Sequence, residues 1–256
     1  IYGCGESFTS LNKYGQKVNL FTTDPNGVEN AGMYKPIPFF MSSRGYGMFM
    51  HTSSPVTCDF GATYGAVTNL MIGDENLDLF VFLGEPKDIL DEYTNLTGKA
   101  IMPPLWSFGL WMSRITYFSE ADGRNVANLL RKNGIPSDVI HFDTGWFGTD
   151  WRCDYQFAKD RFPDPKKMIA DFKRQHIRTI LITEPFVLKT SLNYEQSKHL
   201  LAVDSTGNPY TLQEFYFGKG GIIDIFRKDA QQWFYSKYKA QMDIGVTGWW
   251  GDLGEP

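Results

Sequence analysis

A repeated order of strand, loop and helix in residues 105–256 constrains the fold more than any other feature. Apolar, β-branched and aromatic runs predict strands over 108–112, 139–143, 178–184 and 246–252. Apolar residues at helical spacing predict helices over 119–133, 165–175 and 228–244, the first with Ser119 as its cap and Gly134 just past its end. This alternation predicts an α/β fold with parallel strands, which is either the first half of a (β/α)8 TIM barrel or a doubly wound sheet.

The turn after the first predicted strand bears on that choice. A doubly wound nucleotide-binding fold places a glycine-rich phosphate turn there, and residues 113–118 contain no glycine. The sequence therefore favours the barrel.

The chain divides into three segments by composition. Residues 1–86 have short aromatic and β-branched runs broken by Gly, Asn and Pro, which predict part of an antiparallel β-sandwich. Residues 87–104 form a predicted linker and boundary, with helical spacing from about Glu85 to Thr97 and a break at Pro103-Pro104. Residues 105–256 form the predicted half barrel.

Three of the predicted strands end on an acid, namely Asp143, Glu184 and Asp252. Chemistry in a parallel barrel occurs at the carboxyl ends of the strands, so these side chains are expected at one mouth. Four tryptophans are expected beside them: Trp111, Trp146, Trp249 and Trp250. For Asp252 a simple helix cap is the competing interpretation.

Carboxylates among aromatic side chains indicate carbohydrate chemistry. Aromatics make up 16% of the chain, and aromatic faces pack against the C–H faces of sugars. A pair of acids can hydrolyse a glycosidic bond, one as nucleophile and one as proton donor. A hard-cation site built from oxygens remains an alternative. Cys4, Cys58 and Cys153 are an odd set without metal-ligand spacing, so we expect neither a disulfide framework nor a zinc site and treat the three as bystanders.

Charge and hydropathy exclude other classes. The net charge is −4 with no run of Lys and Arg, so no nucleic-acid partner is expected. No apolar run is long enough for a membrane span, and no signal peptide is visible at the start. The chain begins in mid-pattern at Ile1, as if cut from a longer protein, and the compartment stays open between bacterial periplasm and cytoplasm.

The order of several short motifs resembles glycoside hydrolase family 31, the retaining α-glucosidase and α-xylosidase family, over nearly the whole chain. The motifs are Tyr2-Gly-Cys-Gly-Glu6, Tyr34-Lys-Pro-Ile-Pro-Phe-Phe-Met, Arg44-Gly-Tyr-Gly, Pro104-Leu-Trp-Ser-Phe-Gly-Leu-Trp, His141-Phe-Asp143, Phe162-Pro-Asp-Pro and Trp250-Gly-Asp252-Leu-Gly-Glu255-Pro. No single motif is decisive; their order and spacing together are specific.

The resemblance implies roles for four acids. Asp252 matches the nucleophile, which forms a covalent glycosyl intermediate. Asp143 matches an acid that binds sugar hydroxyls at the nonreducing end. Asp24 matches an acid on a loop over the same pocket, although it is also a turn residue in Asp-Pro-Asn-Gly. Glu255 matches the glutamate of the nucleophile motif and is expected to support Asp252.

Three further residues are candidate sugar contacts. Tyr216 falls where the resemblance places a pocket aromatic. Trp146 and Arg114 lie in predicted strand-end loops, where each is either a sugar contact or structural.

The chain departs from the family pattern at Gly254 and Glu184, and it keeps the tryptophan of the nucleophile motif at Trp250. Gly254 replaces an Asn of the nucleophile motif. Trp250 stands where the α-xylosidase branch tends to have Lys, which favours a glucosyl pocket. Glu184 stands where many relatives have Asn, and it is a candidate for binding a further glucose unit.

The resemblance also implies a missing part. The family's general acid/base lies on a later strand than any in this chain, so we expect the remaining half of the barrel elsewhere and the isolated chain to be inactive and poorly folded. The leading interpretation is a retaining α-glycoside hydrolase acting on the nonreducing end of α-linked oligosaccharides, without a cofactor. A 4-α-glucosyltransferase, an α-xylosidase and a noncatalytic sugar-binding protein are the alternatives.

Overall fold

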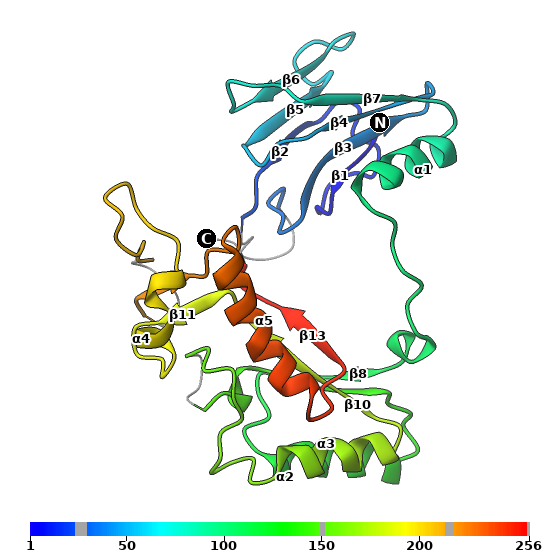
Figure 1. Cartoon of the computed structure of the whole chain (residues 1–256). Helices are drawn as coiled ribbons and strands as arrows, with labels where there is room; N and C mark the ends of the chain where they lie inside the picture. Colours follow the sequence, from blue (N-terminus) through cyan, green and yellow to red (C-terminus); the bar gives the residue numbers. More distant parts are fainter. Residues whose placement is uncertain (24–29, 149–151, 213–217, 255–256) are drawn as a thin grey trace. The chain divides into compact units, whose positions relative to one another are not determined.

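The structure is a computed structural model that describes residues 1–23, 30–148, 152–212 and 218–254. It divides into two compact units, Ile1–Met102 and Pro103–Gly254. The break falls at the paired prolines Pro103 and Pro104, which interrupt both helix and sheet. Each unit is described by itself (Figure 1).

The first unit contains two antiparallel sheets. One has the order β1 (Tyr2–Gly5), β3 (Pro36–Ser42), β4 (Tyr46–Met50) and β7 (Leu79–Leu83). The other has the order β2 (Lys17–Leu20), β5 (Val56–Phe60) and β6 (Thr68–Ile72). Their inward residues share one core, in which Phe40 of the first sheet meets Phe60 of the second edge to face at 4.9 Å. The predicted β-sandwich segment is confirmed.

Helix α1 (Pro86–Thr97) packs on this unit. Ile89 is fully buried beside Phe39, Phe49 and Phe82, and the ring of Tyr93 stacks on Phe39 with centroids 4.0 Å apart. The segment expected to be a linker helix is therefore anchored to the first unit by its apolar face.

The second unit is built on a four-stranded parallel sheet. Its order is β13 (Gly248–Gly251), β10 (Arg178–Thr183), β9 (Val139–Phe142) and β8 (Trp111–Met112). Each new strand along the chain adds to the same side of the previous one. A doubly wound sheet reverses its strand order at a switch point, and this sheet does not. The strand order is that of the first half of a barrel.

Three helices connect these strands. In α2 (Glu120–Lys132), Ser119 Oγ accepts from the backbone N–H of Asp122, and in α3 (Pro165–Arg174), Asp164 accepts from Lys167. Both helices pack under β9 and β10 (Figure 1). Gly123 lets α2 approach the sheet, since a Cβ there would lie 2.6 Å from Phe142 Cζ. The third helix is α5 (Lys228–Met242).

Other short elements lie outside the predicted pattern. The hairpin-like pair β11 (Phe186–Leu188) and β12 (Gly220–Ile222) is antiparallel and forms, with α4 (Tyr194–Ser197), an insertion between β10 and α5. Three 3-10 turns cover η1 (Leu105–Phe108), η2 (Thr144–Trp146) and η3 (Lys198–Leu200). The expected first strand over 108–112 was too long, because η1 takes up Phe108 and pairing begins only at Trp111.

Candidate active site

Three carboxylates follow adjacent strands of the parallel sheet. Asp143 comes after β9, Glu184 after β10 and Asp252 after β13. Pairing between β10 and β13 continues past the last strand residue, because the N–H of Asp252 donates to the carbonyl oxygen of Thr183 at 2.9 Å. The sheet thus brings these acids to one edge, as the sequence predicted.

The strand register also places the acids on one face. Phe142, Leu181 and Trp249 are cross-strand neighbours, and Phe142 points toward α2 and α3. Side chains alternate between the two faces of a sheet, so His141 and Trp250 point the other way. Their rings meet edge to face at 5.0 Å. Asp143, Glu184 and Asp252 follow two residues after His141, Ile182 and Trp250, on the side away from α2 and α3.

Asp143 is nearly inaccessible, with 2% of its surface exposed. Its Oδ1 accepts from the backbone N–H of Thr144 at 2.7 Å, which starts the turn η2. Burial raises the pKa of Asp143, and the hydrogen bonds from Thr144 oppose that rise. The side chain therefore has a structural contact as well as a place at the candidate site.

Glu184 is the most deeply buried of the three acids, with no exposed surface. The thiol of Cys153 donates to its Oε2 at 2.7 Å, and the hydroxyl of Tyr155 donates to its backbone oxygen. Burial raises the pKa of Glu184 to about 7, the charges of Asp252 and Asp143 add to that rise, and the thiol contact opposes it. The three acids follow adjacent strands of one sheet, which is consistent with this influence of Asp143 and Asp252 on Glu184.

His141 lies under the candidate site and was given no role in the sequence analysis. It is 4% exposed, and its Nδ1 is 2.8 Å from Ser113 Oγ. Burial lowers the pKa of His141 to about 4, so the ring is neutral at pH 7. Its Nε2 has no hydrogen-bond partner among the described residues. A neutral ring packed on Trp250 can fix the position of that indole.

Trp250 and Trp146 have different environments. Trp250 is 42% exposed on the face of the acids. Trp146 is fully buried, its Nε1 donates to the carbonyl of Ile182 at 3.1 Å, and its ring packs on Phe147 and Phe157. Of the two interpretations given above for Trp146, these contacts support the structural one.

Of the four remaining candidate residues, the structure describes only Arg114. Arg114 is exposed, two residues beyond β8. Asp24, Tyr216 and Glu255 lie outside the described residues. The competing interpretation of Asp252, a helix cap, is not tested, because the described residues end at Gly254.

Cys153 and Tyr155 were missed by the sequence analysis, which treated Cys153 as a bystander. Both contact Glu184 across about 30 intervening residues. No local pattern signals a contact over that separation. A cysteine and a tyrosine in the loop after a strand that ends on an acid were the only available hint.

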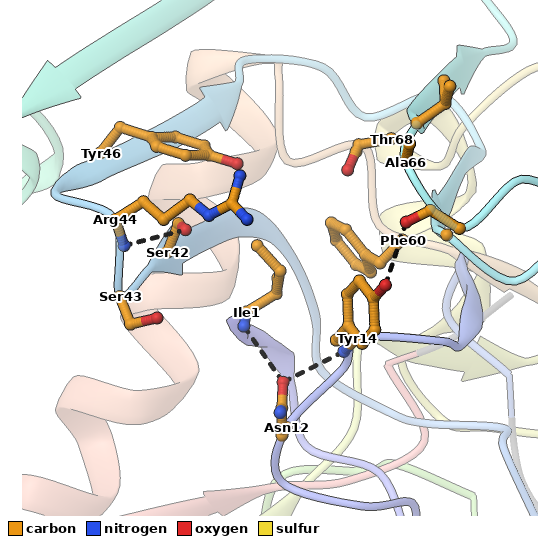
Figure 2. Close-up of a pocket in the computed structure, with 13 residues that line it drawn as sticks. Ile1, Asn12, Tyr14, Ser42, Ser43, Arg44, Tyr46, Phe60, Ala66 and Thr68 are labelled. Atoms are coloured by element: carbon orange, nitrogen blue, oxygen red, sulfur yellow. Dashed lines mark hydrogen bonds between the residues drawn. The ribbon is translucent and has the colours of Figure 1, made fainter.

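The first unit holds a separate hollow of about 690 Å³. Figure 2 shows the guanidinium of Arg44 beside Tyr46 and Ser42, with Tyr14 and Asn12 opposite. None of the residues that line the hollow is an acid, so it cannot carry acid-catalysed glycoside chemistry.

The described parts of the chain contain neither a cluster of metal ligands nor a membrane-spanning helix. No three His, Cys, Asp or Glu side chains there are grouped to hold a metal ion. No helix there has the length and apolar character that crossing a membrane requires.

The sheet order and the acids at its carboxyl edge are those of the first half of a parallel α/β barrel. Residues 100–256 match the glycosyl hydrolases family 31 TIM-barrel domain, and residues 1–59 match the glycosyl hydrolase 31 N-terminal galactose mutarotase-like domain. The chain belongs to glycoside hydrolase family 31.

Individual relatives agree with this assignment. The chain is 33% identical to the alpha-xylosidase XylQ of Lactiplantibacillus pentosus and 32% identical to alpha-glucosidase 2 of Bacillus thermoamyloliquefaciens, in both cases over 100% of its length. It covers 34% and 33% of those proteins, about a third of their length.

Among solved structures, the Flavobacterium johnsoniae GH31 dextranase complexed with glucose matches with a TM-score of 0.91 at 30% identity. That match covers 100% of this chain and 32% of the dextranase. A mutant of the same dextranase has been solved with isomaltotriose, at a TM-score of 0.89 and 29% identity.

Proposed function

We propose that the full-length protein containing this chain is a retaining α-glycosidase that acts on the nonreducing end of α-linked glucosides. The observation that carries the proposal is Asp252 at the carboxyl end of β13, paired to β10 and beside the acids Asp143 and Glu184, in a family 31 barrel domain.

The proposed reaction has two steps, formation and hydrolysis of a covalent glycosyl-enzyme intermediate. A carboxylate oxygen of Asp252 attacks the anomeric carbon, the bond to the leaving oxygen breaks, and a proton from a general acid passes to that oxygen. Water then attacks the anomeric carbon on the face opposite Asp252 and gives its proton to the general acid/base. The ester bond between the sugar and Asp252 breaks, which frees the carboxylate. We propose none of the residues of this chain as the general acid/base, because the family resemblance places that group on a later strand.

The other side chains would bind the sugar. Asp143 would accept hydroxyl donors at the nonreducing end, and the exposed face of Trp250 would pack against the ring. Asp24 and Tyr216 are proposed to complete the pocket, Arg114 to reach it from β8, and Glu255 to support Asp252. Glu184 accepts the thiol of Cys153 and Trp146 donates to the carbonyl of Ile182, so we do not assign either side chain to a sugar contact.

The proposal must also choose between a glucoside and a xyloside as substrate, because two similar relatives are named for different sugars. XylQ is named an alpha-xylosidase, and alpha-glucosidase 2 is nearly as similar. We favour the glucoside, because Trp250 stands where the α-xylosidase branch tends to have Lys.

Product analysis with the full-length enzyme tests the function. Maltotriose and isomaltotriose would be incubated separately and resolved by chromatography over time, with 4-nitrophenyl α-xyloside as a parallel substrate. Steady release of glucose supports the hydrolase. Early products longer than the substrate would support a glucosyltransferase instead, because a sugar hydroxyl then replaces water. No turnover of any α-glycoside, with sugar binding retained, would support the noncatalytic alternative.

A further inference from the structure

The contact between Cys153 and Glu184 forms a buried pair that the proposed reaction does not yet use. Both side chains are fully buried, and the thiol donates to Oε2 at 2.7 Å. The other carboxyl oxygen, Oε1, is buried without a hydrogen-bond partner among the described residues. A permanently ionised carboxylate with one thiol donor would be poorly solvated there.

The loop that carries Cys153 is fixed in place. The hydroxyl of Tyr155 donates to the backbone oxygens of Glu184 and Phe186, and Gln241 of α5 donates to the backbone oxygen of Tyr155 at 3.0 Å. Cys153 and Tyr155 have φ of 54° and 53°, in the left-handed region that non-glycine residues rarely adopt. These hydrogen bonds therefore maintain a loop geometry that sets the thiol against the carboxyl.

Among the described residues, the charged groups that act on Glu184 are both negative. Asp143 after β9 and Asp252 after β13 both act on it through their negative charges. Cys153 and Tyr155 face it from the loop after β9, and Tyr238 of α5 contacts the neighbouring Thr183. No Lys or Arg forms an ion pair with it within the described part of the chain. Burial and like charges both favour its uncharged form.

We infer that Glu184, held by the Cys153 thiol, is a positioning residue that keeps its proton while the neighbouring Asp252 carries the charge of the nucleophile. This inference rests on the proposed function. A neutral Glu184 adds no further negative charge beside Asp143 and Asp252. Ionisation of Glu184 would place an unpaired charge at a fully buried position and draw water toward it, which disturbs the position of the neighbouring Asp252.

The direction of the pH effect follows from the same geometry. The burial-raised pKa of Glu184, about 7, means that the proton is present in mildly acidic solution and lost as the pH rises through neutrality. The rate at which Asp252 forms its glycosyl ester should therefore fall above about pH 7. Replacing Glu184 with Gln keeps the neutral, isosteric state at every pH.

The test measures that ester-forming rate in the full-length enzyme with a 5-fluoro α-glucosyl fluoride. Fluoride needs little proton donation to leave, so titration of the general acid does not dominate the pH profile. We expect the wild-type inactivation rate to fall through pH 7, and that of Glu184→Gln to stay level from pH 6 to 8. At pH 6 the two rates should agree within about threefold, because both carry a neutral group.

Cys153 supplies a second pair of variants. Cys153→Ser keeps a donor and should retain the wild-type profile, whereas Cys153→Ala removes a donor to the ionised carboxylate and should move the fall to higher pH. Glu195→Gln, an exposed acid with 77% of its side chain accessible, is the matched control and should change nothing.

Each outcome decides between the proposals. A fall near pH 7 that persists in Glu184→Gln, or a loss of more than about a hundredfold at pH 6 in that variant, overturns the inference and leaves the nucleophile assignment intact. If the wild-type enzyme is never labelled at Asp252, the proposed function itself fails. If Glu184→Gln does not fold, the Cys153 pair alone decides, since an unshifted profile in Cys153→Ala contradicts the role of the thiol.

Discussion

The backbone N–H of Asp252 donates to the carbonyl oxygen of Thr183 at 2.9 Å, one residue beyond the last residue of β13. This bond extends the β10–β13 pairing to the residue that carries the proposed nucleophile. A strand-paired residue has little backbone freedom, which suits a group that must meet an anomeric carbon within a fraction of an ångström.

The first prediction concerns the carboxylate itself. Asp252→Asn keeps the size of the side chain and removes its negative charge, so kcat/KM for α-glucosides should fall by at least about a thousandfold. Asp160→Asn is the control, because Asp160 is an acid of the same unit with 81% of its side chain exposed. Retention of more than a tenth of the activity in Asp252→Asn would argue against a nucleophile at this position.

The second prediction concerns sugar choice. Trp250→Lys replaces an exposed indole at the site by the residue type of the α-xylosidase branch. The ratio of kcat/KM for 4-nitrophenyl α-xyloside to that for the α-glucoside should rise about tenfold, the scale on which pockets distinguish one carbon group. Tyr235→Lys, an exposed aromatic on α5, serves as the control. An unchanged ratio would mean that Trp250 does not face the discriminating part of the sugar.

The third prediction concerns the loop after β9. Tyr155→Phe removes the hydroxyl that donates to the carbonyls of Glu184 and Phe186 and leaves both buried oxygens without it. Unfolding free energy in urea should fall by about 1–3 kcal/mol. Tyr235→Phe, with its residue 62% exposed, should be neutral. Equal stabilities of the two variants would show that the Tyr155 hydrogen bonds contribute nothing net.

The fourth prediction links His141 to stability below neutral pH. Its folded-state pKa of about 4 lies below its ordinary 6.5, so the unfolded chain binds the proton more readily. Stability should therefore decline as the pH falls from about 6.5 to 4, by on the order of 3 kcal/mol from this group.

Comparing His141→Gln with the wild type in urea titrations at pH 7 and pH 4.5 isolates the contribution of His141. The difference in unfolding free energy between the two pH values should be smaller in His141→Gln. His199→Gln, on an exposed residue, should keep the wild-type difference. An identical pH dependence in His141→Gln and the wild type would contradict a buried, neutral imidazole.

Local signals predicted the helices and strands of the second unit well. Ser119 caps α2, and α3 and α5 start at the expected Pro165 and Lys228. These signals act within a few residues, so they are visible in the sequence. The short strands β11 and β12 were not predicted, because each has only three residues and they pair across about 30 others.

At the candidate site, too, local features could be predicted from the sequence and long-range contacts could not. The acids at strand ends were visible because a strand pattern that stops at an acid is a local feature, and the sheet places Asp143, Glu184 and Asp252 at one edge. The depth of Glu184 and its thiol partner were not visible, since burial depends on how the loop with Cys153 folds back on β10. Trp146 shows the converse case, where a residue type suited to sugars is used in the core.

The central claim is that Asp252 forms the covalent intermediate, and mass spectrometry tests it most directly. The full-length enzyme would be inactivated with a 5-fluoro α-glucosyl fluoride, digested and sequenced by tandem mass spectrometry. We expect one added fluoroglucosyl group, located on Asp252 and absent from Asp252→Asn. A label on a different carboxylate, or turnover of α-glucosides with no labelled peptide, would contradict it.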